Sequence, residues 1–344
     1  MRALILAGGK GTRLRPLTVY TPKPIVPVLN RPFLTYQLDL LRKAGITDVT
    51  LSLSYQPNKI EDVLGDGSEF GVRLQFVTEP SALGTAGAVR FAIEAASEPV
   101  LVLNGDILTD LDLSRMVQAH TDRRDQITIA LARVEDPTKY GLVAMNSDAT
   151  IKSFIEKPKD GTFEGSTNTI NAGIYILESS ALDLIPKGAH SSFEYDVFPK
   201  ALEQGLAFSG YVLEDNYWQD IGTPQSYLSA HLDILSGKAG FALGDRTDSG
   251  ETSPTAFIEN SIVGDGCVIK PNAKIINSVL GAGVHVEEKV VIEDSVIWAH
   301  TRVSSFAKMR ESVVGKGCHI GKDAELRAGS VLGDKAMIPD YSVV

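Results

Sequence analysis

Cysteine is scarce in this chain: among its 344 residues, Cys267 and Cys318 carry the two thiols. Two isolated cysteines provide neither a disulfide framework nor a metal cluster. Long apolar runs are also missing, because no stretch approaches the roughly 20 residues that a membrane-spanning helix needs. The apolar start Arg2–Ala7 is too short for a signal peptide and breaks into Gly-Gly-Lys-Gly, so we interpret it as a buried strand. We expect a cytoplasmic protein.

An excess of positive charge is absent as well. The formal net charge is −10, so the chain as a whole has no electrostatic attraction to nucleic acid or to an anionic membrane. Any phosphate group that it binds must therefore meet a local cluster of cations or backbone N–H groups. The content of 43% hydrophobic and 22% charged residues is that of an ordinary globular protein, and the length suffices for two domains.

Short apolar strands alternate with amphipathic stretches in the first part of the chain, which indicates an α/β domain with a parallel sheet covered on both faces. We predict strands over Ala3–Ala7, Val49–Ser54, Arg73–Val77, Val100–Leu103, Ile127–Val134, Ile170–Leu177 and Phe208–Leu213. We predict helices over Phe33–Lys43, Lys59–Leu64, Ala86–Ala96 and Pro224–Leu235. The last of these helices closes the domain.

A stretch rich in Gly, Ser, Asp and Thr follows and is typical of a linker. We therefore divide the chain into a first domain at 1–235, a linker at 236–255 and a second domain at 256–344. In the second domain a tetrapeptide recurs every 17 residues, with its serine at Ser261, Ser278, Ser295 and Ser312. A fixed short period of this kind indicates a repeat architecture.

Within each repeat, aliphatic residues fall about six positions apart. They are Val263, Ile269, Ile275, Leu280, Val286, Ile292, Ile297, Val303, Met309, Val314, Ile320, Leu326, Leu332 and Ile338. A small or β-branched residue usually follows four positions later, and glycine follows directly at 264, 281, 315, 321 and 333. This hexapeptide pattern resembles the left-handed parallel β-helix, in which three hexads make one triangular coil and coils bury their faces by stacking. Both cysteines take the small position, so we interpret them as core residues.

The first strand runs into the glycine-rich, basic turn Gly8-Gly9-Lys10-Gly11-Thr12-Arg13-Leu14-Arg15-Pro16. This turn is not a Walker loop, which ends in Gly-Lys-Ser/Thr, and Leu14 replaces the third glycine of the dinucleotide fingerprint. It offers backbone N–H groups at a strand end, glycines that let a phosphate approach, and two guanidinium groups. These features suit the triphosphate of a nucleotide. Lys23, held between two prolines, adds a further cation.

Together these motifs resemble the sugar-1-phosphate nucleotidyltransferases, which make NDP-sugars. Further matches are Glu79-Pro80, Leu83-Gly84-Thr85-Ala86-Gly87, Leu103-Asn104-Gly105-Asp106, Lys139-Tyr140-Gly141, Glu156-Lys157-Pro158, Asn171-Ala172-Gly173-Ile174-Tyr175 and Trp218-Gln219-Asp220-Ile221-Gly222-Thr223-Pro224. The tail resembles that of the longer members, particularly mannose-1-phosphate guanylyltransferases. The resemblance implies a Rossmann-like mixed sheet followed by a left-handed β-helix. It also implies a reaction in which a sugar 1-phosphate oxygen attacks the α-phosphorus of a nucleoside triphosphate and expels pyrophosphate.

The resemblance implies roles for individual residues. Arg13 and Lys23 would bind the triphosphate and stabilise the transition state, while Asp106 and Asp220 would hold Mg²⁺, a hard ion that takes oxygen ligands. These four are the expected catalytic residues. The expected nucleotide-binding residues are Leu6, Ala7, Gly8, Gly9, Gly11, Thr12, Arg13, Lys23, Glu79, Gly84 and Thr85. The expected sugar phosphate-binding residues are Gly141, Glu156, Lys157 and Asn171, with Lys157 on the phosphate. The chemistry needs no activated Ser, Cys or His nucleophile.

The nucleobase is predicted from Glu79. A carboxylate is acceptor-only and can accept both N1–H and N2–H₂ of guanine, whereas the pyrimidine-using relatives tend to carry glutamine at the matching position. We therefore expect GTP. The sugar motifs resemble mannose-1-phosphate guanylyltransferases most, although Arg31-Pro32-Phe33-Leu34 and Gly65-Asp66-Gly67-Ser68 also resemble heptose-1-phosphate guanylyltransferases. Glucose 1-phosphate with dTTP or UTP stays open.

Two other classes compete with this prediction. A catalytically silent regulatory subunit would lack the cationic or metal positions, and all of them are present here. Acyl transfer by the β-helix would use a catalytic histidine, but His285, His300 and His319 lie in tight coils without a loop insertion, which favours a solvated coil face. We expect the tail instead to pack subunits into a homo-oligomer. The expected partners are thus a nucleoside triphosphate, a sugar 1-phosphate and further copies of the chain.

Overall fold

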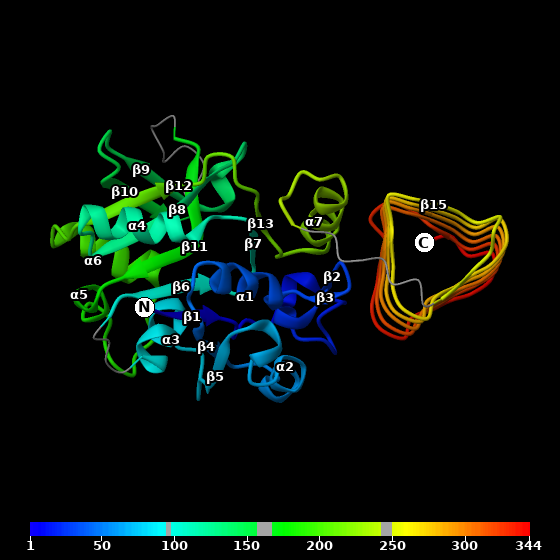
Figure 1. Ribbon diagram of the computed structural model, residues 1–344, viewed down its shortest axis with the longest axis horizontal. Helices are drawn as coiled ribbons and strands as arrows, with labels where there is room; N and C mark the ends of the chain where they lie inside the picture. The colour runs from blue at the N-terminus through cyan, green and yellow to red at the C-terminus, as the bar shows by residue number, and fades with distance from the viewer. Residues whose placement is uncertain (94–97, 157–166, 242–249) are drawn as a thin grey trace. The chain divides into compact units, whose positions relative to one another are not determined.

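The computed structural model describes residues 1–93, 98–156, 167–241 and 250–344. The contacts between their Cα atoms divide the chain into two compact units. The first unit joins Met1–Gly9 to Leu34–Trp218, and the second joins Lys10–Phe33 to Gln219–Val344. Figure 1 labels the helices and strands of both units.

A nine-stranded mixed sheet forms the centre of the first unit. Its parallel part has the order β6 (Val100–Asn104), β1 (Arg2–Leu6), β4 (Asp48–Leu53), β5 (Arg73–Thr78). Beyond β6 the sheet continues with β11 (Thr169–Leu177), β8 (Ile127–Arg133), β9 (Gly141–Met145), β10 (Ile151–Glu156) and β12 (Phe208–Val212). Strand β11 is antiparallel to both β6 and β8. The predicted α/β domain with a mixed sheet is therefore confirmed.

The helices of the first unit are α1 (Leu34–Lys43), α2 (Pro57–Leu64), α3 (Gly84–Ala92), α4 (Leu113–Arg123), α5 (Ser179–Leu182) and α6 (Phe198–Glu203). Helix α2 begins two residues before its predicted start, because a proline fits the first turn of a helix. The predicted end of α3 at Ala96 lies outside the described residues. Helix α4 was not predicted, although Asp112 caps it by accepting from the amides of Ser114 and Arg115. Every helix in the described ranges falls short of what a membrane crossing requires.

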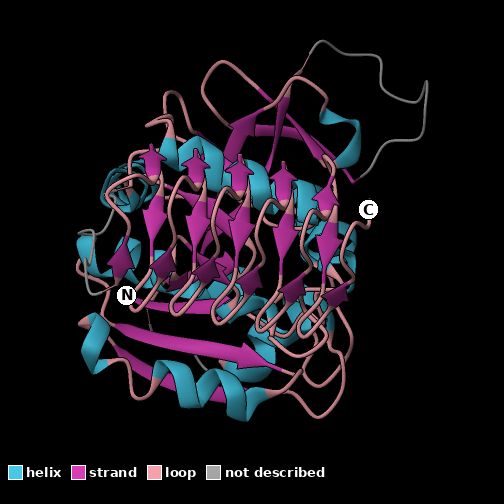
Figure 2. Ribbon diagram, turned by 90° about the vertical axis from the view of Figure 1, so that its right-hand side faces the viewer, coloured by secondary structure: helices cyan, strands magenta, loops and turns pink. Residues whose placement is uncertain are grey.

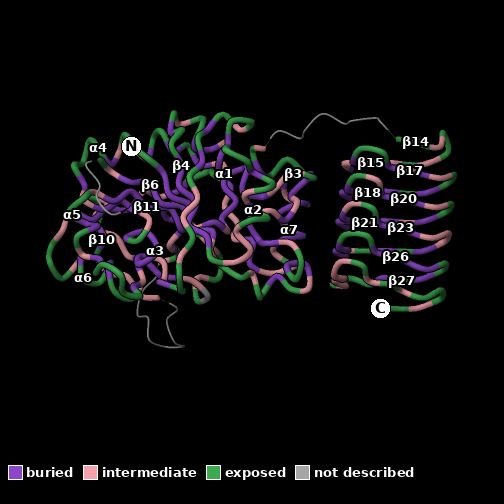
Figure 3. Tube along the Cα trace, turned by 90° about the horizontal axis from the view of Figure 1, so that it is seen from below, coloured by how far each residue is buried: buried purple, intermediate pink, exposed green. Residues whose placement is uncertain are grey.

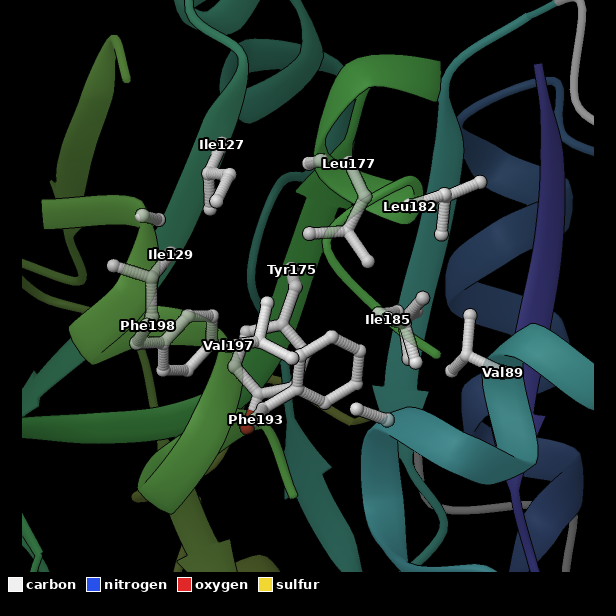
Figure 4. Close-up of a cluster of buried hydrophobic side chains, with 14 of the residues drawn as sticks. Val89, Ile127, Ile129, Tyr175, Leu177, Leu182, Ile185, Phe193, Val197 and Phe198 are labelled. Atoms are coloured by element: carbon white, nitrogen blue, oxygen red, sulfur yellow. The ribbon is translucent and has the colours of Figure 1, made fainter. Parts of the chain in front are cut away.

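Aromatic and aliphatic side chains fill the core between the sheet and the helices of this unit. Figure 4 shows Tyr175 of β11 packed with Phe193 and Phe198, whose ring centroids lie 5.5 Å apart. Phe193 begins a single π-helical turn, Phe193–Val197, that leads directly into α6. Figure 3 shows the buried residues concentrated along β4, β6 and β11. The core thus fixes the central strands, whose carboxyl ends carry the predicted site residues.

Three parallel sheets form the β-helix of the second unit, and Figure 2 shows their strands stacked coil upon coil. The first sheet contains β14 (Glu251–Thr252), β17 (Val268–Ile269), β20 (His285–Val286), β23 (Arg302–Val303), β26 (His319–Ile320) and β29 (Met337–Ile338). The second contains β15 (Phe257–Glu259), β18 (Lys274–Ile276), β21 (Val291–Glu293), β24 (Lys308–Arg310) and β27 (Glu325–Leu326). The third contains β16 (Ile262–Val263), β19 (Val279–Leu280), β22 (Val296–Ile297), β25 (Val313–Val314) and β28 (Val331–Leu332).

The interior of the β-helix follows the predicted repeat. Paired residues such as Ile269 and Val286 are one period apart, and the aliphatic positions form a single buried cluster. Cys267 and Cys318 are buried in that cluster, and burial raises the pKa of both thiols. Their prediction as core residues is confirmed, since a buried thiol with a raised pKa is a poor nucleophile. His300 and His319 are exposed on the coils, as expected, whereas His285 is half-buried.

Outside the β-helix, the described residues of the second unit include two short 3₁₀ turns, a hairpin, the end of strand β13 (Trp218–Asp220) and a helix. The turns are η1 (Thr12–Leu14) and η2 (Lys23–Ile25), and the hairpin pairs β2 (Pro27–Val28) with β3 (Arg31–Pro32). Strand β13 leads to helix α7 (Pro224–Leu235), which begins at its predicted residue. Thr223 and Ser226 cap α7 reciprocally, which satisfies amides at its first turn.

His231 of α7 is fully buried, and its ring centroid lies 4.4 Å from that of Tyr227. Burial lowers the pKa of His231 from 6.5 to about 4, although its Nδ1 lies 2.8 Å from the carbonyl oxygen of Tyr227. The imidazole is therefore neutral in the folded chain near neutral pH, and it becomes charged more readily in the unfolded chain.

This burial predicts a loss of stability in acid. As the pH falls from 6.5 to about 4, the unfolded chain binds a proton at His231 that the folded chain does not, so the free energy of unfolding decreases by up to about 3 kcal/mol. The His231→Gln variant keeps a side-chain donor but cannot titrate. Thermal unfolding measured across this pH window should show a flatter decline for the variant, and equal slopes would contradict the prediction.

Candidate functional site

The carboxyl ends of β1 and β4 meet closely at Gly8. A Cβ atom on Gly8 would lie 3.0 Å from Oγ of Ser54 and 3.3 Å from Oε1 of Glu79. The Ser54 hydroxyl donates a hydrogen bond of 2.5 Å to the Gly8 carbonyl. A side chain at Gly8 would therefore be crowded by Ser54 and Glu79, whereas a Cβ on Gly9 would meet no atom within 4 Å. The first glycine permits close packing, and the second leaves the backbone open to a ligand.

Glu79 follows β5, and its carboxylate connects β4 to the residue before α3 through hydrogen bonds. Its Oε1 accepts a hydrogen bond of 2.8 Å from the Ser52 hydroxyl, and its Oε2 accepts one of 3.2 Å from the Leu83 amide. Each carboxylate oxygen has a second lone pair for a further donor. The half-buried carboxylate thus has a structural role and retains acceptor capacity. Ser52 was not predicted as a site residue, because a lone serine inside a buried strand carries no sequence signal.

The second half of the glycine-rich turn packs against Lys23. Gly11 has a φ of 62°, and a Cβ on it would lie 3.1 Å from Cβ of Lys23 and 3.2 Å from Cγ2 of Thr18. The Thr18 hydroxyl donates to the Gly11 carbonyl at 2.7 Å. Lys23 is 8% exposed, so its stem is fixed by the turn that carries the arginines. The structure therefore brings Lys23 to Gly11, as expected for a shared phosphate site.

Arg13 and Asp220 meet at Gly222. A Cβ on Gly222 would lie 2.8 Å from Oδ2 of Asp220 and 3.2 Å from Nη2 of Arg13. Arg13 is exposed while its neighbour Leu14 is fully buried, so the apolar side chain anchors the turn and leaves the guanidinium accessible. An arginine and a carboxylate beside one glycine form a polar centre suited to phosphate groups and a hard cation.

Asp106 lies at the end of β6 in the first unit. The amide of Gly105 donates to the Leu6 carbonyl at 2.9 Å, and a Cβ on Gly105 would lie 2.6 Å from the same oxygen. Position 105 therefore has no room for a side chain. The close contact between the Gly105 and Leu6 backbones places Asp106 next to the end of β1. The edge that carries Gly8 and Glu79 thus also carries this carboxylate.

The loop at Ser191 packs against the start of α3 and accepts hydrogen bonds from its amides. The amides of Ala86 and Gly87 both donate to the Ser191 carbonyl at 3.0 Å, and a Cβ on Gly84 would lie 2.5 Å from that oxygen. The Thr85 hydroxyl accepts from the Phe193 amide at 3.0 Å and donates to Glu194 at 3.1 Å. Gly84 and Thr85 therefore dock α3 onto this loop, in addition to any contact with a nucleotide.

Asn104 of β6 and Asn171 of β11 lie close to Tyr175 on the central strands. Asn171 Nδ2 donates to the Tyr175 hydroxyl at 2.9 Å, and Asn171 Oδ1 accepts from the Gly173 amide at 2.9 Å. A Cβ on Gly173 would lie 2.8 Å from Nδ2 of Asn104. Burial raises the pKa of Tyr175 well above its usual range, and the Glu194 charge adds to this effect, so the phenol stays protonated.

Asn104 was missed as a site residue by the sequence prediction. Its Oδ1 is buried and, among the described residues, has no hydrogen-bond partner. A buried polar atom without a partner is costly, and such atoms are often completed by a ligand or by water. The signal was its place between a buried strand and Asp106, because polar residues at the carboxyl end of a sheet strand line ligand sites.

Gly141 and Glu156 are paired residues on the antiparallel strands β9 and β10. A Cβ on Gly141 would lie 2.6 Å from Oε2 of Glu156, so the carboxylate covers the glycine backbone. Lys157 lies outside the described residues. The predicted site residues of the first unit are Leu6, Ala7, Gly8, Gly9, Glu79, Gly84, Thr85, Asp106, Gly141, Glu156 and Asn171. Those of the second unit are Gly11, Thr12, Arg13, Lys23 and Asp220.

Two family models match this chain. The model described as "Nucleotidyl transferase" matches residues 2–237, and the model described as "EIF2B subunit epsilon LbH domain" matches residues 248–344. The second match agrees with the three-sheet coil, so the predicted left-handed β-helix is confirmed.

The chain is also similar to named nucleotidyltransferases. Mannose-1-phosphate guanylyltransferase of Mycobacterium tuberculosis is 40% identical over 239 residues, which cover 69% of this chain and 65% of the relative. Mannose-1-phosphate guanylyltransferase catalytic subunit beta of Drosophila melanogaster is 42% identical over 239 residues, covering 68% of this chain and 63% of the relative. The chain therefore aligns with slightly less than two thirds of the length of these relatives.

A solved structure supports the fold over most of the chain. The crystal structure of a putative glucose-1-phosphate thymidylyltransferase from Bacillus anthracis, in complex with sucrose, superimposes with a TM-score of 0.62 at 26% identity. The match covers 70% of this chain and 97% of that one. Since the nucleotidyl transferase model spans well over half of the residues, including the glycine-rich turn and the carboxylates around it, the chain belongs to the nucleotidyl transferase family.

Proposed function

We propose that this chain is a sugar-1-phosphate nucleotidyltransferase that converts GTP and mannose 1-phosphate into GDP-mannose and pyrophosphate. The observation that carries this proposal is the arrangement in the second unit, where Lys23 packs against Gly11 and Arg13 lies with Asp220 at Gly222. This arrangement supports binding of a polyphosphate, because it presents two cationic side chains in one unit. The guanylyltransferase names of the relatives from Mycobacterium tuberculosis and Drosophila melanogaster support the choice of substrates.

The reaction needs positioning and charge neutralisation more than covalent chemistry. An oxygen of the sugar 1-phosphate attacks the α-phosphorus of GTP, and the bond from that phosphorus to the bridging oxygen of the β-phosphate breaks, releasing pyrophosphate. Negative charge grows on the α-phosphoryl oxygens during this step. Arg13 and Lys23 are the proposed cations that stabilise this charge. They are held in place by buried Leu14 and by the Gly11 turn, which reduces the reorganisation required during the reaction.

The nucleotide is proposed to lie along the carboxyl edge of the parallel strands. Leu6, Ala7, Gly8 and Gly9 offer backbone groups there, while Gly11 and Thr12 continue the same turn. Glu79 is the proposed guanine reader, because each of its carboxylate oxygens keeps a lone pair beyond the bonds to Ser52 and Leu83. Gly84 and Thr85 complete this edge at the start of α3.

The sugar phosphate is proposed to contact Gly141, Glu156 and Asn171, with Lys157 binding its phosphate. Glu156 and the Asn171–Tyr175 pair supply acceptors and donors for sugar hydroxyl groups. The buried Oδ1 of Asn104 adds an acceptor beside them. This set suits a polyhydroxylated ring, in which each hydroxyl group both donates and accepts.

Asp106 and Asp220 are the proposed ligands of Mg²⁺. Carboxylate oxygens are the donors that this hard ion prefers. Within the described ranges no group of three or more His, Cys, Asp and Glu side chains is placed to hold a metal ion, so phosphate oxygens and water would supply the remaining ligands. When bound, the ion would neutralise phosphate charge.

Other assignments remain alternatives. A glucose-1-phosphate thymidylyltransferase or uridylyltransferase and a heptose-1-phosphate guanylyltransferase would use the same cations with a different base or sugar. A non-catalytic regulatory subunit is a remote alternative. Assembly into a homo-oligomer through the β-helix, the cytoplasmic location and the domain boundaries at 235 and 256 also stay predictions.

A matrix of nucleoside triphosphates and sugar 1-phosphates tests the proposed substrates. Pyrophosphate release should be fastest with GTP and mannose 1-phosphate, because Glu79 accepts from guanine and the sugar motifs resemble those of mannose enzymes. GTP, dTTP, UTP and ATP should each be paired with mannose, glucose and heptose 1-phosphates. A clear preference for dTTP or UTP would remove the guanine assignment, and no turnover with any pair would favour the regulatory subunit.

The metal assignment predicts that Asp106→Asn and Asp220→Asn each lower metal-dependent turnover by about 10²- to 10³-fold, the usual effect of removing one stabilising group from a charged transition state. Both amides keep the side-chain shape, so thermal unfolding should change little. The measurement is pyrophosphate release across a Mg²⁺ titration. Activity close to that of the unmodified chain in both variants would show that the metal assignment is wrong.

The base assignment predicts that Glu79→Gln shifts selectivity from GTP toward dTTP and UTP, because an amide can both donate and accept. The readout is the ratio of kcat/KM values for GTP and dTTP, which should fall by about tenfold or more, as expected when a buried donor–acceptor match is lost. Ser52→Ala is the matched control, since it removes a partner of Glu79 without altering its acceptors. An unchanged ratio in Glu79→Gln would assign base recognition to other groups.

A further inference from the structure

One column of corners in the β-helix departs from the repeat. The residues that directly follow the strands of the third sheet are Gly264, Gly281, Trp298, Gly315 and Gly333. A Cβ on Gly264 would lie 2.6 Å from the amide nitrogen of Ala282 in the next coil, which explains the preference for glycine. Trp298 interrupts this column, yet it is only 4% exposed. A large buried side chain at a corner needs a partner outside the coils.

That partner is Tyr227 of α7, which is fully buried. The indole N–H of Trp298 donates to the Tyr227 hydroxyl at 2.9 Å, and the Tyr227 hydroxyl donates to the Pro27 carbonyl. The direction of both bonds is determined, because an indole can only donate and a carbonyl can only accept. The β-helix is thus connected through one phenol to the hairpin Pro27–Pro32.

The hairpin makes hydrogen bonds to residues outside its own strands. Pro27 is paired with Pro32, and neither has an N–H group, so the pair cannot exchange backbone hydrogen bonds. The hydroxyl of Tyr227 supplies a donor to Pro27 from outside the hairpin. At the tip, Asn30 has a φ of 65° and donates from Nδ2 to the Leu280 carbonyl at 2.8 Å. The hairpin is thus bonded at Pro27 to Tyr227 of α7 and at Asn30 to Leu280 of the β-helix.

A third contact lies at the last glycine of the column. A Cβ on Gly333 would lie 3.0 Å from Cβ of Pro16, at the end of the glycine-rich turn. Leu280, which directly precedes the corner residue Gly281, and the corner residues Trp298 and Gly333 therefore contact the segment 10–33 directly or through Tyr227, and these three residues are here called the corner column. The contacts lie at both ends of the stretch that contains Lys23.

The contacts continue from the hairpin to the phosphate-binding turn. The amide of Val26 donates to the Lys23 carbonyl at 3.2 Å, so the single hydrogen-bonded turn η2 connects Lys23 to Pro27. The stem of Lys23 packs against Gly11. A displacement of Pro27 would therefore shift Lys23 relative to the turn that carries Arg13.

We propose that the corner column positions the phosphate-binding segment 10–33, with Trp298 and Asn30 as positioning residues for the nucleoside triphosphate. This inference rests on the proposed function, because it takes the triphosphate to be the ligand of that segment. This role explains why a tryptophan replaces glycine at position 298. The indole N–H group reaches the Tyr227 hydroxyl, which a glycine could not reach.

The test compares Trp298→Phe and Tyr227→Phe in the full chain. Each variant keeps an aromatic ring. Trp298→Phe removes the bond from Trp298 to Tyr227, and Tyr227→Phe removes both that bond and the bond from Tyr227 to Pro27. The KM for GTP should rise about fivefold, the effect of losing one net hydrogen bond, while the KM for mannose 1-phosphate stays within about twofold. Since the Trp298 bond ends on the Tyr227 oxygen, the double variant should be no worse than Tyr227→Phe alone. Amide hydrogen exchange over residues 11–33 should be faster in all three.

Arg302→Ala is the control, because it changes an exposed residue of the first sheet and removes a surface ion pair with Glu287, which contributes little. It should leave both KM values and the exchange rates unchanged. Wild-type GTP affinity and unchanged exchange over 11–33 in both aromatic variants would overturn the inference.

Asn30→Gly provides a second test if an aromatic variant does not fold. Glycine tolerates the positive φ and removes the donor to Leu280, so exchange over residues 27–33 should increase. Unchanged exchange would contradict the inference. If the wild-type chain converts no nucleoside triphosphate, the proposed function fails, and the hydrogen-exchange comparison still tests the positioning role by itself.

Discussion

Close backbone packing at the glycine-rich turn is the constraint on which the site depends. Gly8 lets Ser54 and Glu79 approach the end of β1, and Gly11 lets Lys23 and Thr18 approach the other half of the turn. A Cβ would lie 3.0 Å from its nearest neighbour at Gly8 and 3.1 Å at Gly11, closer than most Cβ atoms pack. Because Gly8 and Gly11 carry no side chain, the backbone of each half of the turn packs closely on its own neighbours, and the N–H groups of the turn and Arg13 are suited to a phosphate group.

The β-helix contributes to the same constraint. Its interior follows a regular repeat, and regular coils need only aliphatic residues inside and small residues at corners. Trp298 serves neither purpose. Its buried indole donates a hydrogen bond to the buried phenol of Tyr227, and such bonds specify a geometry because an unmade bond would leave a buried polar group unsatisfied.

Much of the fold could be predicted from the sequence. The hexad pattern depends on side-chain size at a fixed spacing, so it predicts coil, core positions and the burial of Cys267 together. Strand and helix alternation predicted the α/β domain. Asn104 and Ser52 escaped prediction as site residues, because their roles arise from neighbours far along the chain: Gly173 for one and Glu79 for the other. A capped helix, α4, was missed because its apolar positions are few.

The sequence by itself determined the family, the mixed sheet and the coil, because each of these depends on local patterns and ordered motifs, and the same motifs supplied the site residues that we propose. The tertiary structure decided which partners those residues have. It showed that Glu79 is bonded to Ser52 and Leu83, that Arg13 lies with Asp220 at Gly222, and that Trp298 reaches Pro27 through Tyr227. The reason is physical: hydrogen bonds and close contacts depend on distances between residues that lie up to hundreds of positions apart, and no local pattern encodes those distances.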